Sequence, residues 1–187
     1  MTKKVLLVSA MQNDFFTDDG ALPSKMENVE KFKNDVANFV KDFDGHIFFS
    51  KYETFPESVL FNSIPKHCLV GTPGAELINE IGSILNQKCE EDPSFIPYIY
   101  NSRELINASL CTTVSNVCEG TELHIIGFSL NGNILDNLIQ IVNDASYRRN
   151  YLPKVIIHSD LFFDTNKDLF NMYVLTKLAP YFNVSVV

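Results

Sequence analysis

The chain has 187 residues, of which 45% are hydrophobic, and its formal net charge is -8 at pH 7. This length suits one domain over residues 1–187 with a single substantial core, and no stretch approaches the ~20 apolar residues of a membrane-spanning helix. No basic run offsets the negative charge, which argues against nucleic acid and anionic membranes as partners.

Short apolar runs rich in β-branched and aromatic residues recur along the chain. Continuous runs of this kind are typical of strands that are covered on both faces. The predicted strands are, in chain order, residues 5–10, 46–51, 96–100, 123–128, 155–159 and 184–187.

Segments with apolar residues at helical spacing lie between these runs. A Ser24-x-x-Glu27 capping box is expected to open the first helix, over residues 26–43. The remaining predicted helices run from Pro73 to Leu85 with Thr72 as N-cap, from 106 to 117, from Asn131 as cap to Ala145, and from 169 to 178 before Pro180. For residues 106–117, which are rich in small and β-branched residues, the position between two strands favours the helix.

Strands and helices alternate from end to end. This order predicts right-handed crossovers and an α/β fold, a doubly wound sheet of about six parallel strands with helices on both faces. Ligands bind such sheets outside the carboxyl ends of the strands. Functional residues are therefore expected near Ala10, residues 50–52, Asn101 and the loop after Gly127.

Two motifs in the chain are specific. The first is Met11-Gln12-Asn13-Asp14-Phe15, which continues into Gly20-Ala21-Leu22-Pro23. The second runs from Pro65 to Leu77 as Pro-Lys-His-Cys-Leu-Val-Gly-Thr-Pro-Gly-Ala-Glu-Leu. Both resemble motifs of the isochorismatase-like cysteine hydrolases, the superfamily that includes the nicotinamidases. The resemblance extends in order over almost the whole chain and implies the same α/β fold.

The resemblance also implies where a catalytic Asp/Lys/Cys triad would lie. Ala10 stands in the place of the general base, Asn101 in that of the lysine, and Asn133 in that of the nucleophilic cysteine. A methyl group accepts no proton, and a carboxamide cannot replace a thiolate activated at a helix N-terminus. We therefore expect no hydrolysis of nicotinamide or isochorismate. Arg103, two residues beyond Asn101, is expected at the surface.

Many nicotinamidases bind a divalent metal through an Asp-x-His after the second strand and through the histidine of the second motif. Here Ser50-Lys51-Tyr52 replaces the Asp-x-His, and His67 is the one ligand that remains. A single imidazole is a weak site, so we predict no metal, and no other cofactor is implied. His67 is instead expected to hydrogen-bond a loop backbone, and the neighbouring Cys68 to be structural.

A ligand pocket could remain without the triad. The residues expected to line it are Phe15, Tyr52, Asn101, Ser129 and Asn133. Phe15 matches the aromatic residue that packs on ring substrates in nicotinamidases, and plain core packing is an equal alternative. The backbone amides of Ser129 and Asn133 align with the oxyanion hole of the superfamily, and backbone donors survive side-chain replacement. Asp14 is expected to organise nearby backbone.

These observations predict a non-catalytic member that binds a small molecule or a protein partner and forms a homo-oligomer, as relatives commonly do. One alternative is a hydrolase of unknown substrate that uses other residues, among them Asp14, His67 and Arg103. Another is a purely structural subunit, favoured if large side chains such as Tyr52, Phe128 or Leu130 fill the pocket. Four cysteines without zinc-site spacing or disulfide-scaffold density favour reduced thiols and a cytoplasmic location.

Overall fold

The computed structural model describes residues 4–102, 107–129, 133–165 and 183–187, together with Asp168, Met172 and Val174. The side chains of Ser102 and Asn133 are outside this description. So are Arg103, the predicted cap Asn131, Leu130 and most of the predicted helix 169–178.

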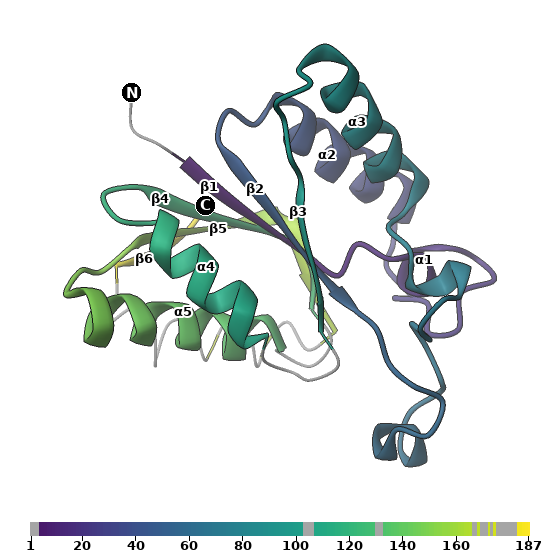
Figure 1. Cartoon of the computed structure of the whole chain (residues 1–187). Coiled ribbons are helices and arrows are strands. Elements are labelled where there is room, and N and C mark those ends of the chain that lie inside the picture. Colours follow the sequence, from purple (N-terminus) through teal and green to yellow (C-terminus); the bar gives the residue numbers. More distant parts are fainter. Residues whose placement is uncertain are drawn as a thin grey trace.

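Six strands form one sheet in the order β3-β2-β1-β4-β5-β6, and all five pairings are parallel (Figure 1). Their bounds are β1 Lys4–Ser9, β2 His46–Tyr52, β3 Tyr98–Ser102, β4 Glu122–Ser129, β5 Lys154–Asp164 and β6 Val184–Val186. The predicted doubly wound sheet of six parallel strands is confirmed.

Two pairs of helices cover the two faces of this sheet (Figure 1). α2 (Val29–Asp42) and α3 (Asn79–Glu91) pack on one face, and α4 (Ala108–Val117) and α5 (Asn133–Arg149) on the other. The short helices are α1 (Asn13–Phe16) and the 3-10 turns η1 (Val59–Asn62) and η2 (Pro73–Ala75). No helix among the described residues has both the length and the apolar character needed to cross a membrane.

The central strand β1 contributes to both cores. Val5 and Leu7 pack under α4 and α5, whereas Leu6 and Val8 pack under α2 and α3. Alternate residues of a strand point to opposite faces, so a strand covered on both sides is apolar throughout. This explains why the apolar run of β1 is continuous and does not alternate with polar residues.

The first two long helices begin later than predicted. α2 starts at Val29 after Asn28, which has a left-handed backbone and makes no side-chain cap bond, so the capping box at Ser24 is wrong. The Ser24 amide donates instead to the Phe15 carbonyl, which holds this segment against α1.

The helix predicted from Pro73 is divided into η2 and α3. The amide of Asn13 donates to the carbonyl of Glu76, and the amide of Ile78 donates to the carbonyl of Met11. These bonds to the chain leaving β1 hold residues 76–78 extended, and α3 therefore begins only at Asn79. By contrast, the predicted helix at 106–117 is confirmed as α4, with the Asn107 side chain accepting from the Leu110 amide.

Strands β3 and β5 also differ from the prediction. β3 ends two residues later, at Ser102, and β5 continues past residue 159 to Asp164. The pairing of β5 with β4 shifts so that residues 158–161 form a bulge opposite Ile126. Bulges of this kind bend a strand and redirect its side chains.

Two histidines meet where this bulge begins. His124 Nδ1 lies 2.8 Å from His158 Nε2. Phe39 of α2 packs against His158, and Phe43, the residue after α2, packs against His124. One of the two nitrogens must be unprotonated to accept this bond. Burial lowers the pKa of both histidines. For His124, the nearby Lys4 and Lys154 lower the pKa further, whereas Glu122 opposes them.

Acidification should therefore destabilise the protein through this pair. The folded-state pKa values lie below the ordinary 6.5, so the unfolded chain takes up these protons first as the pH falls. The free energy of unfolding should decline below about pH 6.5, by up to ~1.4 kcal/mol per pH unit for each proton.

Urea unfolding of the wild type and of the double variant His124→Gln/His158→Gln, between pH 7.5 and 5.5, measures this slope. The double variant should show a much shallower slope. His46→Gln, at the exposed start of β2, is the control and should keep the wild-type slope. An unchanged slope in the double variant would contradict the assignment.

Candidate functional site

The backbone turns sharply where β1 ends, at the carboxyl edge of the sheet. Ala10 has a left-handed conformation, with φ 46°, and its amide donates to the Ser50 carbonyl at 2.8 Å. Its methyl group is buried in the core under α2 and α3. This conformation costs an alanine roughly 1–2 kcal/mol, and aspartate is one of the few residues that adopt it more readily. Ala10 therefore supplies packing but no base.

The buried side chain of Gln12 joins three segments at this edge. Its Nε2 donates to the carbonyls of Tyr52 and Ala75, each at 2.7 Å, and its Oε1 accepts from the Tyr52 amide at 2.7 Å. The end of β2 and the turn η2 are thus held against the chain that leaves β1.

Asp14 organises the backbone of two loops, as predicted. Its Oδ1 accepts from the Ala21 amide at 3.0 Å, and its Oδ2 accepts from the Cys68 amide at 2.5 Å. A Cβ on Gly74 would lie 2.3 Å from this carboxylate, so the close approach requires glycine at that position. Both carboxylate oxygens are therefore engaged in holding the fold.

Four aromatic side chains pack together beside this turn. The ring of Phe15 lies 4.6 Å from that of Phe128, 6.2 Å from that of Tyr52 and 5.6 Å from that of His67, between ring centroids. Phe15 and Phe128 are fully buried. Of the two interpretations of Phe15, this packing favours a core residue over a ring that receives a substrate. Aromatic pairs at such distances contribute about 0.5–1.5 kcal/mol beyond their buried area.

Tyr52 extends this cluster toward the start of α5. Burial raises the pKa of its hydroxyl, and the carboxylates of Asp136 and Asp164 raise it further through their negative charge. Asp136 is in the first turn of α5, and Asp164 ends β5. A neutral phenol therefore lies close to the region that the resemblance assigns to the triad.

Among the described residues, Lys51 is a buried cation at this edge of the sheet, whereas Asn101 is exposed on the edge strand β3. The two residues are register partners on β2 and β3. Lys51 is 6% exposed, and its ammonium lies 3.0 Å from Glu76 and 4.0 Å from Glu53. Sequence reasoning missed Lys51, because it occupies the variable middle position of the Asp-x-His motif.

Ser129 ends β4, and Asn133 begins α5. Ser129 is buried and its carbonyl accepts from the Thr165 amide at 3.1 Å. Asn133 begins α5, so its backbone is at the helix N-terminus as expected. The register partner of Ser129 is Asp164, a buried carboxylate that the sequence prediction missed because it ended β5 at residue 159.

The residues that replace the nicotinamidase metal ligands do not fit a metal. His67 is buried, and its Nδ1 donates to the Pro65 carbonyl at 2.8 Å, as predicted for a histidine that bonds a loop backbone. Ser50 and Tyr52 offer hydroxyl groups, which are poor ligands for a divalent cation compared with carboxylate and imidazole. Across the described ranges, no three histidine, cysteine or acidic side chains form a group that could hold a metal ion.

One region of the structure contains an aspartate, a lysine and a cysteine, the three residue types of the triad. They are Asp14, Lys51 and Cys68, and none of them is at a position that the resemblance assigns to the triad. The Cys68 thiol is fully buried, and burial raises its pKa. The Asp14 carboxylate adds to this rise, and Lys51 opposes it. A reactive cysteine needs a lowered pKa and access to solvent, so this arrangement holds a loop and does not generate a thiolate.

Known structures share this fold over its whole length. The nicotinamidase/pyrazinamidase PncA from Bacillus subtilis matches with a TM-score of 0.71 at 17% identity, covering 99% of both chains. An isochorismatase-like hydrolase from Alkaliphilus metalliredigens matches at 0.66 and 20% identity, covering 99% of this chain and 94% of the other. The pyrazinamidase of Pyrococcus horikoshii in complex with zinc matches at 0.66 and 17% identity, covering 99% and 98%.

The chain therefore has the isochorismatase-like α/β fold. No protein-family model and no curated protein matches its sequence.

The thiols should differ sharply in reactivity. Cys89 is exposed, whereas Cys68, Cys111 and Cys118 are buried and burial raises the pKa of each of these three. We expect maleimide at pH 7.5 to label one site per native chain, at Cys89, and four sites after denaturation. Mass spectrometry of intact and digested protein counts and locates the labels. Cys89→Ser should label at no site in the native state, and rapid labelling of Cys68 would show a reactive thiol.

Proposed function

We propose that this protein is a non-catalytic binding protein built on the isochorismatase-like fold. The observation that carries the proposal is the buried methyl group of Ala10 at the position of the general base. The other two positions also lack the residue types of the triad. Asn133, at the start of α5, replaces the cysteine, and the exposed Asn101 replaces the lysine. Loss of cooperating triad members removes nearly all of the rate that they provide together.

A protein partner, which can be a second copy of the chain, is favoured over a small ligand bound in the region that corresponds to the substrate site of nicotinamidases. Phe15 packs against both Phe128 and Tyr52 there, and large side chains leave less room for a ring substrate. The segment around η1 supports an interface, because it projects from the body of the molecule (Figure 1) and carries exposed apolar side chains. These are Phe55, Val59 and Leu60.

The second candidate function is a hydrolase of other chemistry in the same region. The observation in its favour is that Asp14 and Lys51 lie close enough to Cys68 for their charges to act on the pKa of its thiol. The cytoplasm is the proposed location for either function, supported by four cysteines that are all free.

We expect no conversion of nicotinamide to nicotinate above an enzyme-free control. Removal of a nucleophile or base from a catalytic triad costs on the order of 10⁴–10⁶ in kcat. Liquid chromatography of overnight reactions at 50 µM protein measures the product, and a nicotinamidase with an intact triad, assayed in parallel, is the positive control. Turnover well above the enzyme-free rate would refute the proposal if it survives in both Cys68→Ser and Cys89→Ser. Turnover that is lost in Cys68→Ser would favour the second candidate, a hydrolase that uses Cys68.

The η1 segment is expected to mediate self-association. The substitution Val59→Asp places a charge on a side chain that is 79% exposed, so it should weaken an apolar interface without disturbing the core. Light scattering on a size-exclusion column between 5 and 200 µM measures the mass, and Val59→Asp should reduce it toward 21.2 kDa. Tyr147→Asp, on the exposed face of α5, is the matched control. A monomeric wild type at all concentrations would argue against the interface.

A further inference from the structure

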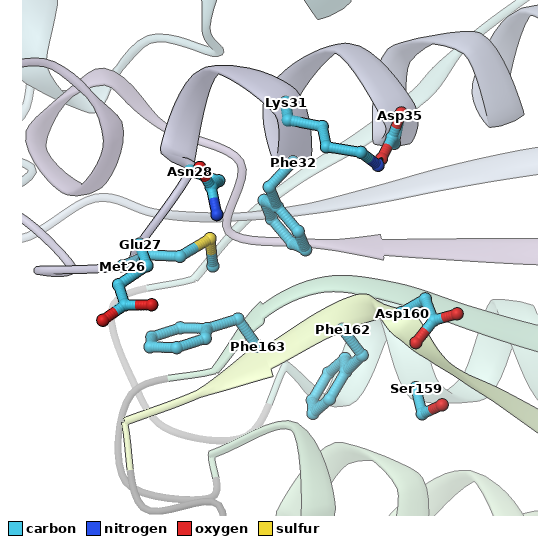
Figure 2. Close-up of a pocket in the computed structure, with 10 residues that line it drawn as sticks. All are labelled: Met26, Glu27, Asn28, Lys31, Phe32, Asp35, Ser159, Asp160, Phe162 and Phe163. Carbon is cyan, nitrogen blue, oxygen red and sulfur yellow. The ribbon is translucent and has the colours of Figure 1, made fainter.

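A hollow separates the N-terminal end of α2 from the bulged part of β5 (Figure 2). Its volume is about 230 Å³, somewhat below the ~300 Å³ at which typical ligand pockets begin. The residues that line it are Met26, Glu27, Asn28, Lys31, Phe32, Asp35, Ser159, Asp160, Phe162 and Phe163. It is separate from the positions assigned to the triad, none of which lines it.

The inner wall of the hollow is apolar and firmly held. Phe32 projects from α2 toward β5, and Phe163 and Met26 close one end (Figure 2). The ring of Phe32 stacks on Phe16 at 5.8 Å between centroids, and that of Phe163 stacks on Phe128 at 6.0 Å. Because these rings are fixed by the core behind them, the wall is preformed. Fixed aromatic faces attract a cation through the quadrupole of the ring.

The rim of the hollow carries more negative than positive groups. Glu27, Asp35 and Asp160 contribute carboxylates, and among the described residues that line the hollow Lys31 is the single cationic side chain. Lys31 and Asp35, which both line the hollow, form an ion pair along α2 (Figure 2), and the charge of Lys31 is also attracted by Asp160. The carboxylates of Glu27 and Asp160 are left at opposite ends of the hollow, with no cation of the lining to neutralise both.

The N-terminus of α2 acts in the opposite direction, because a helix N-terminus carries about half a positive charge. Two carboxylates in excess outweigh this half charge. The β5 bulge places Asp160 at the hollow: residues 158–161 have no register partner on β4, and two of them, Ser159 and Asp160, are exposed and line the hollow.

We propose that this hollow binds a small organic cation, an ammonium group joined to an aromatic or aliphatic group. The apolar part packs against Phe32 and Phe163, and the ammonium group lies near Asp160. A ligand of about ten heavy atoms suits this volume, and its dissociation constant is expected to be on the order of 1 mM. The proposal goes beyond the proposed function and does not depend on whether the protein lacks catalysis.

Three probes of nearly equal size separate charge from apolar contact. These are phenethylamine as cation, 2-phenylethanol as its neutral counterpart and phenylacetate as anion. At ten times the dissociation constant, phenethylamine should raise the melting temperature by about 3 °C, and the other two by less than a third of this. Amide chemical shifts in the ¹⁵N-labelled protein should change at Ser159 and Asp160.

Matched variants locate the binding. Asp160→Asn removes the carboxylate beside the ammonium group and should weaken phenethylamine at least threefold, while leaving 2-phenylethanol unchanged. Glu27→Gln removes the carboxylate at the opposite end of the hollow and should weaken phenethylamine less than Asp160→Asn does. Glu119→Gln removes an exposed carboxylate in the turn between α4 and β4, and should have no effect. Equal binding of the alcohol and the amine, equal effects of Glu119→Gln and Asp160→Asn, or no phenethylamine binding up to 20 mM would each overturn the proposal.

Discussion

The carboxyl edge of the sheet depends on the buried carboxamide of Gln12. Its three hydrogen bonds tie the end of β2 and the turn η2 to the chain leaving β1. Each of these backbone groups would cost about 1–3 kcal/mol if it were buried without a partner. Because a carboxamide both donates and accepts, no aliphatic or acidic residue of the same size could serve all three bonds. The position of Asp14, two residues later, follows from this arrangement.

The residues that this chain shares with the first motif are those that build the edge. Gln12 and Asp14 bond only to backbone groups in the contacts described, and Gly74 makes room for the Asp14 carboxylate. The proposed function requires the loss of the general base, and the residue at that position is Ala10. Its methyl side chain makes no polar contact. In this short stretch the side chains that hold the backbone are different from the side chain at the position of the base. The structural residues can therefore persist when the base is absent.

The sequence was sufficient for the sheet, because short continuous apolar runs such as that of β1, bounded by polar residues, are typical of buried strands. It failed where long-range bonds override local preference. Thr72 and Pro73 are good helix-start residues, yet the bond from the Ile78 amide to the Met11 carbonyl delays α3. Asp164 was missed because a bulge lengthens β5, and bulges leave no regular pattern. Lys51 was missed because it occupies the variable position of a motif, and its burial is visible only in three dimensions.

The backbone of Ala10 shows that the shape of this edge does not depend on a catalytic side chain. An alanine gains nothing from a left-handed conformation, and its methyl group makes that conformation costly. The conformation persists because the Ala10 amide donates to Ser50 and its carbonyl accepts from Gln12 at 2.9 Å. Strain at such a position is maintained by its surroundings. A buried carboxylate at this position would add a desolvation cost, which the methyl group of Ala10 avoids.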